Sequence, residues 1–375
     1  MTWYLLNISF LFVMGLSDSL ECRVMPEETN RNRKALFVLE TLIWIVLSGL
    51  RRWDIGEDTS TYAYMFEREM TLPWSSVWDE FTKKYILQLP GVVDPGYKVF
   101  EKITHFITKD YQCFLVIVAV IFFASLALFL YRNSYFPVLS YTLFSSMFYS
   151  FYALTGIRQT IATAIVVFLG TEAIKKRQLV RFVILTSIAA TIHLSALCFF
   201  PFYWLSRIRI TKRTIGIYWI LIVLSYIFKN NLFSALQFLI GYDQYSVFQA
   251  KTSPYTFLGL LLLMSVFVTL FYKQITKKIS YGLDIRKSSA IVEENESGRM
   301  AVNALFISGI FSSLVLINPS CMRVVNYYSL FLMILLPGCV GVFNCRSKRL
   351  YVYICMIVLT LLLLRNQPVY YFFWQ

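Results

Sequence analysis

Three ionisable residues border or interrupt long apolar runs of the sequence: Arg158, His193 and Arg323. Charge is costly at membrane depth, so each is by default a candidate for function. Arg158 opens a predicted helix in Gly156-Ile157-Arg158-Gln159. Its guanidinium and the positive end of the helix dipole would both favour an anion such as a phosphate. Arg323 begins another predicted helix and could supply a second cation. The competing interpretation for both arginines is an anchor that reaches lipid headgroups.

His193 is one of two histidines in the chain and is followed by Leu194 and Ser195. An imidazole there can donate a hydrogen bond to a sugar or phosphate oxygen, or carry a proton. A lone histidine is more often structural, so position alone leaves both interpretations open. The other histidine, His105, lies in a predicted surface helix and is assigned no role.

A dense group of charges follows the second apolar run, in Arg51-Arg52-Trp53-Asp54-Ile55-Gly56-Glu57-Asp58-Thr59. Two cations and three carboxylates this close together can hold a diphosphate and a base. The alternatives are an interfacial anchor for the arginines and a helix cap for Asp58. The chain has no Asp-x-Asp pair and no phosphate-cradling glycine loop, which argues against a metal-bound nucleotide-sugar site.

The elements that must position these residues are membrane helices. Of the 375 residues, 58% are hydrophobic and 18% aromatic, more than a soluble domain of this length carries. Uncharged runs long enough to cross a bilayer recur along the chain. The sequence therefore predicts one all-α polytopic membrane domain over residues 1–375, a bundle of roughly ten to twelve spans. The clearest runs are 112–131, 252–272, 300–322 and 324–345, and shorter or polar-interrupted ones are 1–17, 35–50, 135–152, 159–171, 214–228 and 350–364.

The net charge of +14 would indicate nucleic acid binding in a soluble protein. Here the basic residues sit at the ends of apolar runs, where they fix orientation, so we expect no nucleic acid partner. The seven cysteines show no paired spacing and predict neither a disulfide framework nor a metal site.

Basic clusters also predict which loops face the cytoplasm, because short cytoplasmic loops are rich in Lys and Arg. Clusters at 175–181 and 207–213 flank the uncharged run 182–206, and a single helix would place them on opposite faces. We therefore predict that 182–206 dips in and returns, as two short helices or a re-entrant loop with its turn near Thr191, Ile192 and His193. The loop 273–299 is then cytoplasmic.

The segment 51–111 lies outside the cytoplasm in this topology. It holds ten of the 21 carboxylates of the chain, so acid–base chemistry would belong to this face. Two stretches in it are predicted to form amphipathic helices on the membrane surface. One runs from Asp58 to Met70, and the other follows Asp94-Pro95-Gly96 with Tyr97, Phe100, Ile103 and Ile107 as its apolar residues.

Taken in order, three stretches resemble the EpsG family of polysaccharide polymerases, relatives of the Wzy O-antigen and capsule polymerases. The resemblance covers most of the chain. One departure is Glu57, where the family often has a smaller residue. The matching residues are Arg52, Gly56, Asp58, Thr59 and Tyr62 with Asp94-Pro95-Gly96-Tyr97; Gly156-Ile157-Arg158-Gln159-x-x-Ala162 with Lys175-Lys176-Arg177 and His193-x-Ser195-Ala196; and Arg323, Tyr327 and Tyr328 with Leu335, Leu336 and Pro337.

The resemblance implies a GT-C-like membrane glycosyltransferase at the outer face of a bacterial cytoplasmic membrane. It would move a growing glycan from undecaprenyl diphosphate onto the next lipid-linked repeat unit, giving capsule, exopolysaccharide or O-antigen. Its partners would be the lipid-linked oligosaccharide and membrane lipid, with a chain-length regulator and a flippase as further candidates.

Such a reaction needs cations that stabilise the departing diphosphate and a base that accepts the proton of the attacking sugar hydroxyl. It implies no cofactor and no metal. The expected roles are diphosphate binding for Arg158, Arg323 and, more weakly, Arg52; base for Asp58 or, second, His193; and sugar contacts for Gln159, Tyr62 and Asp94.

Two other classes share this location. A flippase or transporter for lipid-linked sugars predicts inverted repeats and broken midplane helices. No internal repeat is visible, and the carboxylate-rich external segment fits chemistry better. An O-antigen ligase or a sugar acyltransferase is the enzymatic alternative. An acyltransferase would need a cytosolic acyl donor and a histidine with cytoplasmic access.

Overall fold

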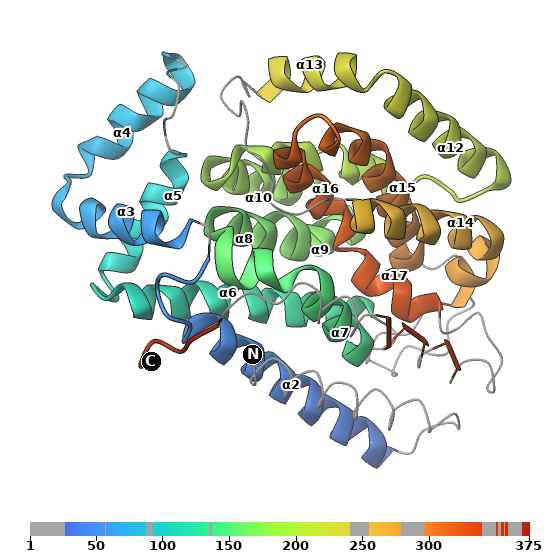
Figure 1. The fold of residues 1–375 in the computed structure, drawn as a ribbon, viewed down its shortest axis with the longest axis horizontal. Helices are drawn as coiled ribbons and strands as arrows, with labels where there is room; N and C mark the ends of the chain where they lie inside the picture. The colour runs from blue at the N-terminus through green and yellow to red at the C-terminus, as the bar shows by residue number, and fades with distance from the viewer. Residues whose placement is uncertain are drawn as a thin grey trace.

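A computed structural model of the protein describes residues 27–240, 255–278, 296–339 and 370–375, with gaps at 57, 88, 90, 91, 93, 135 and 136 and a few residues between 350 and 358 (Figure 1). All regular elements in these ranges are helical, and an isolated bridge between Arg51 and Phe372 is their one β-type contact. The helices are α2 (Glu27–Gly49), α3 (Thr59–Thr71), α4 (Ser75–Phe81), η1 (Thr82–Ile86), α5 (Pro95–His105), α6 (Tyr111–Asn133), α7 (Pro137–Met147), η2 (Ser150–Thr155), α8 (Ile157–Thr163), η3 (Ala164–Leu169), α9 (Gly170–Lys175), α10 (Leu179–Ile192), η4 (Leu194–Phe199), α11 (Phe202–Leu205), α12 (Lys212–Ile227), α13 (Lys229–Ile240), α14 (Tyr255–Lys278), α15 (Glu296–Val315), η6 (Pro319–Cys321), α16 (Met322–Ser329) and α17 (Leu332–Cys339).

Four described helices are long and apolar enough to cross a membrane: Tyr111–Asn133, Ile157–Lys175, Tyr255–Ile275 and Glu296–Val315. The count rises to six if two bent pairs are each one span; α12 with α13 bends by 86°, and Pro319–Ser329 with α17 by 53°. These helices confirm the predicted all-α polytopic membrane bundle.

The expected ten to twelve spans also included shorter runs. Of these, 159–171 lies within the long helix Ile157–Lys175, and 214–228 lies within the bent pair α12 and α13. The run 35–50 forms the shorter apolar helix Phe37–Gly49, and 182–206 forms Leu179–Ile192 and Leu194–Leu205. The run 1–17 and most of 350–364 lie outside the described residues.

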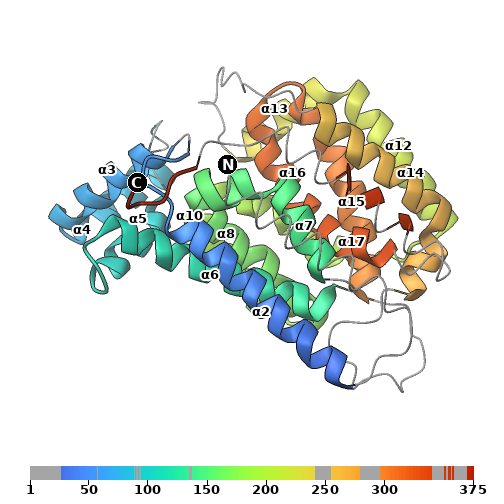
Figure 2. The ribbon, with the colours of Figure 1, turned by 60° about the horizontal axis from the view of Figure 1, so that its bottom comes forward.

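Aromatic side chains hold the first long helices together. Helix α2 runs along α6 in both views (Figures 1 and 2). Trp44 of α2 is almost fully buried; its ring centre lies 5.9 Å from that of Phe123 and 5.2 Å from that of Phe144. Such offset or edge-on ring pairs add to the stability gained from burial alone.

The stretch Ile157–Lys175 carries a basic residue near each end, and the two have different positions in the fold. Lys175 donates hydrogen bonds to Asn133 Oδ1 at 2.8 Å and to Ser297 Oγ at 3.0 Å, which ties α9 to the ends of α6 and α15. The opposite end begins with Arg158. The π-helices η2 and η3 lie on either side of α8, and such widened turns are frequent at functional sites.

A helix break falls at His193. Helix α10 ends at Ile192, His193 is extended with φ −151° and ψ 109°, and η4 begins at Leu194. The run 182–206, for which two short helices or a re-entrant loop were expected, thus contains a helix on either side of His193. Whether the pair enters and leaves the bilayer on one side remains a prediction.

Helices α3, α4 and α5 stand beyond the Tyr111 end of α6 (Figure 1). Helix α5 begins at Pro95 and packs closely on α10, because Gly96 leaves room where a Cβ would collide with Thr191. The helix expected after Asp94 therefore forms. Part of its apolar face packs on the bundle, since Tyr97 is fully buried while Ile103 and Ile107 stay exposed.

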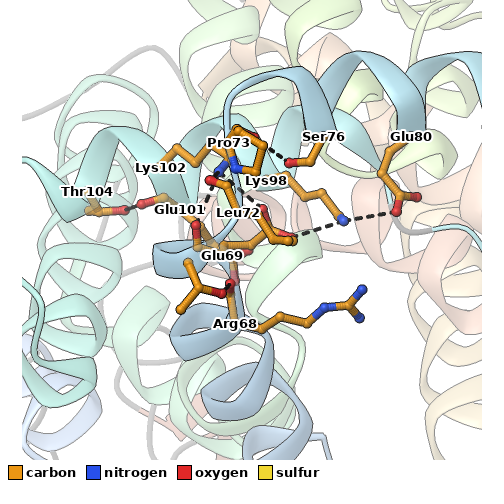
Figure 3. A network of polar contacts seen from close by, with 11 residues as sticks. Arg68, Glu69, Leu72, Pro73, Ser76, Glu80, Lys98, Glu101, Lys102 and Thr104 are labelled. Atoms are coloured by element: carbon orange, nitrogen blue, oxygen red, sulfur yellow. Dashed lines mark hydrogen bonds and ion pairs between the residues drawn. The ribbon is translucent and has the colours of Figure 1, made fainter.

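Buried ion pairs fasten these three helices to one another (Figure 3). Lys98 of α5 lies 3.0 Å from Glu69 Oε1 of α3 and 3.2 Å from Glu80 Oε1 of α4. Lys102 donates to the carbonyl oxygens of Glu69 at 3.1 Å and Leu72 at 2.7 Å. Because these groups are mostly removed from water, the pairs constrain the geometry of the three-helix unit.

The segment Tyr370–Gln375 lies against the end of α2. The Arg52 amide donates to the Tyr371 carbonyl at 2.9 Å, and the Phe373 amide donates to the Leu50 carbonyl at 3.0 Å. The Tyr370 hydroxyl donates to the Leu47 carbonyl at 2.8 Å. The last described residues are therefore joined to the chain directly after α2.

Candidate functional site

Arg158 is the centre of a polar cluster where α8, α3 and the start of α5 meet. Its Nη1 lies 3.5 Å from Asp94 Oδ2, and its Nε donates to the Tyr62 hydroxyl at 3.4 Å. Its guanidinium carbon also lies 5.8 Å from the centre of the Tyr62 ring. Three of the predicted site residues, distant in sequence, are thus in direct contact.

Gln159, next to Arg158 on α8, links the cluster to Arg323 on α16. Gln159 Nε2 donates to the Arg323 carbonyl at 2.8 Å and so fixes α8 to the start of α16. The charges of Arg323 and Arg158 act on both Asp94 and His193. His193 is buried and lies directly after the last residue of α10, at the break between α10 and η4.

Lys84 is a member of the cluster that the sequence did not single out. Its Nζ lies 2.5 Å from Asp94 Oδ1 and donates to the Val92 carbonyl at 3.1 Å. Nothing in its type or spacing separates Lys84 from the neighbouring Lys83, which is exposed. Only the course of the chain from η1 back to α5 brings it there.

Asp94 is a buried carboxylate among three cations. Burial raises the pKa of Asp94, while the charges of Lys84, Arg158 and Arg323 act to lower that pKa. An incoming diphosphate would compete with Asp94 for the same cations, because charge-assisted hydrogen bonds to phosphate oxygens are strong. The arrangement is suited to binding an anion next to a group that can take up a proton.

Asp58 lies one helical turn from the cluster. It precedes α3, is half-buried, and its carboxylate makes no capping hydrogen bond. Its carbonyl accepts from the Tyr62 amide at 3.1 Å. The cap suggested as the alternative role of this side chain is therefore not formed.

Arg52 points to a different set of partners. Its Nε lies 2.6 Å from Asp54 Oδ1, and its guanidinium carbon lies 4.7 Å from the Tyr371 ring centre. These contacts hold it at the exit of α2 beside the C-terminal segment. Arg158, Tyr62 and Asp94 are thus in direct contact, and Gln159 binds the backbone of Arg323. The links of His193 and the Arg323 side chain to this cluster are electrostatic, and the described contacts of Arg52 lie elsewhere.

Two further polar side chains, Tyr97 and Glu101 of α5, are buried, and Tyr97 lies next to Tyr62. The Tyr62 and Tyr97 ring centres lie 5.8 Å apart. The Tyr97 hydroxyl and Glu101 Oε1 are buried, and neither makes a hydrogen bond of normal geometry. Burial raises the pKa of Glu101 to about 8, with the Glu69 charge raising it further and Tyr97, Lys98 and Arg158 opposing.

Replacing Glu101 by glutamine should stabilise the protein only at higher pH. The folded state keeps the proton to about pH 8, whereas the ordinary pKa is 4.5. The folded state therefore binds more protons than the unfolded state between these values. The free energy of unfolding of the wild type therefore falls as pH rises through this window and stays low at higher pH. The loss is about 1.4 kcal/mol for each unit by which the two pKa values differ. Thermal unfolding of purified wild type and Glu101→Gln should give similar Tm values at pH 5 and a higher Tm for the variant at pH 9. Exposed Glu67 supplies the control, Glu67→Gln, and a Tm difference that is the same at every pH would contradict the assignment.

The described residues contain no group of three His, Cys, Asp or Glu side chains that could hold a metal ion. A family model described as the EpsG family matches residues 34–373, nearly the whole chain. No curated protein and no solved structure matches. The family match spans every residue of the cluster, from Tyr62 to Arg323.

Proposed function

Because the chain belongs to the EpsG family, whose members are polysaccharide-polymerase-type membrane proteins, we propose that it polymerises oligosaccharide repeat units carried on undecaprenyl diphosphate. The reaction takes place at the outer face of the bacterial cytoplasmic membrane and builds capsule, exopolysaccharide or O-antigen. The observation that carries this proposal is one buried carboxylate, Asp94, that contacts both Arg158 and Lys84 and is also acted on by the charge of Arg323.

In this reaction the bond between the anomeric carbon of the growing glycan and its lipid diphosphate breaks. A hydroxyl of the next lipid-linked unit forms the new glycosidic bond and loses its proton. The diphosphate leaves with added negative charge, which Arg158 and Arg323 stabilise with Lys84 beside them. Arg52 is the weaker third arginine, because its ion pair with Asp54 already engages it.

The proton of the attacking hydroxyl needs a base. Asp58 is the first candidate, since its carboxylate is not used as a helix cap, and His193 is the second. Gln159, Tyr62 and Asp94 are assigned to the sugars next to the diphosphate. Asp94 is also a third candidate for the base, because it is the carboxylate in direct contact with Arg158.

The base can be identified from surface glycan made by cells that lack this gene and carry a variant at matched membrane expression. We expect Asp58→Asn to reduce polymer by about 100-fold or more, the contribution typical of a general base, and His193→Ala to reduce it less. Asp79→Asn changes an exposed carboxylate of α4 and is the control. A full ladder from Asp58→Asn together with no ladder from Asp94→Asn would show that Asp58 is not the base and would favour Asp94.

The same gels separate polymerisation from export. A polymerase deletion leaves single repeat units on the surface. The rival function, a flippase for lipid-linked sugars, is favoured by the two bent helix pairs, because broken helices are common in transporters. An exporter deletion instead removes single units from the surface, and lipid-linked precursor accumulates on the cytoplasmic side. That result would show that the protein exports repeat units and does not polymerise them.

A further inference from the structure

The external helices expose a group of large apolar side chains that the site does not use. Phe106 is 79% exposed, Ile107 72%, Trp78 70%, and Trp74 and Ile103 51% each. We call these five residues the aromatic patch. Exposed apolar surface of this kind marks a contact with a membrane or with another protein when it is contiguous.

The patch is continuous across two helices. Ile103 lies in the last turn of α5, and exposed Phe106 and Ile107 follow this helix directly in a turn whose amides bond back to Ile103 and Thr104. The Trp74 ring lies nearly parallel to the Phe106 ring, with centres 6.4 Å apart and planes at 16°. Trp78 follows Trp74 by one turn of α4. The start of α4 and the end of α5 therefore present these side chains together.

The patch lies close to the point where the chain enters the membrane. Ile107 is followed within four residues by Tyr111, the first residue of α6. With 23 residues, α6 is about 34 Å long, slightly more than the hydrocarbon thickness of about 30 Å, so its first turn lies at the interface. Four residues of chain reach at most about 14 Å and five at most about 18 Å, which keeps Ile107 and Phe106 near that level.

We propose that the aromatic patch inserts into the lipid leaflet that surrounds the start of α6, where headgroups meet acyl chains. In the orientation proposed above, this is the outer leaflet. Tryptophan prefers this layer because its ring is apolar and its N–H is polar. The Lys102 ammonium lies 5.7 Å from the Trp74 ring centre, and exposed Lys109 follows Ile107 by two residues. Lys109 is placed to meet lipid phosphates, whereas the buried Lys102 is held by the Glu69 and Leu72 carbonyls.

This anchor sets the depth of the site. Lys98 joins α5 to α3 and α4 through Glu69 and Glu80, so the three helices move as one unit. Asp94 immediately precedes α5 and contacts Arg158. Insertion of the patch at the other end of α5 therefore holds the cluster at a fixed height relative to the lipid headgroups, where a lipid-linked diphosphate lies.

The experiment is tryptophan quenching in the full-length protein in nanodiscs. Lipids brominated near the top of the acyl chain are compared with the same lipids unbrominated, for wild type and for Trp74→Phe/Trp78→Phe. The difference in emission between wild type and the double variant is the emission of Trp74 and Trp78. We expect this difference to be much smaller in brominated lipid than in unbrominated lipid. Trp44→Phe is the control, because buried Trp44 should show little quenching by lipid.

Two results would overturn the proposal. Emission from Trp74 and Trp78 that resists brominated lipid and falls with aqueous iodide would place the patch in water. Emission that resists both quenchers would mean that a protein surface, such as a second copy of the chain, covers the patch. Phe106→Lys/Ile107→Lys, which should raise iodide quenching of Trp74, gives a second test. None of these measurements depends on polymer formation, so they can fail independently of the proposed function.

Discussion

Replacing Arg158 by alanine will remove the polymer ladder, and replacing it by lysine will already shorten it. Arg158 reaches Asp94 and Tyr62 at once with different nitrogens of its planar guanidinium. Lysine keeps the charge but cannot reproduce this fork. The loss of one preorganised donor to a developing oxyanion typically costs about 100- to 1000-fold in rate, which is enough to leave single repeat units as the main product.

The measurement is the gel profile of surface glycan from deletion cells that carry wild type, Arg158→Ala or Arg158→Lys at equal membrane levels. Arg181→Ala is the matched control, because Arg181 is an exposed arginine near the opposite end of α10 from His193. Ladders of unchanged length and amount from Arg158→Lys and Arg158→Ala would show that Arg158 does not bind the diphosphate.

Replacing Lys98 by methionine will weaken the packing of α3, α4 and α5 on one another. The change leaves Glu69 and Glu80 without the ammonium that lies 3.0 and 3.2 Å from them. Loss of one partner of a buried pair costs about 3–5 kcal/mol. We expect the lower end of that range, because Lys102 remains 3.6 Å from Glu69 Oε2.

Hydrogen exchange of the full-length protein in lipid measures this effect directly. Amides of α3 and α5 should exchange faster in Lys98→Met, while those of α6 and α15 keep their protection. Lys83→Met is the control, since Lys83 is an exposed lysine of the same unit. Equal protection of α3 and α5 in the two variants would show that the ion pairs do not hold the unit together.

The site residues were predictable where a residue type conflicted with its surroundings. Arg158, His193 and Arg323 stood out because charge beside an apolar run is costly, and the structure brings their charges to bear on Asp94 or on one another. Lys84 gave no such signal, since a lysine in a polar segment is ordinary. Arg52 stood beside Asp58 in sequence, but its orientation depends on Tyr371 at the far end of the chain.

The helices were predictable from run length, and their breaks were not. The uncharged run 112–131 forms the straight helix α6, capped by Asp110, whose carboxylate accepts from the Cys113 amide at 3.1 Å. The run 324–345 was expected as one span, yet α16 ends at Ser329 and α17 turns by 53° after it. Packing against neighbouring helices decides such bends, and composition alone does not reveal them.

The contact between Tyr370–Gln375 and the end of α2 limits the topology of the whole chain. Segments joined by backbone hydrogen bonds lie on the same side of the bilayer, so the chain between Arg52 and Tyr370 must cross it an even number of times. The four straight spans found in the described residues all fall within this interval and already make an even number. If one bent helix pair traverses the membrane fully, an odd number of further traversals must accompany it.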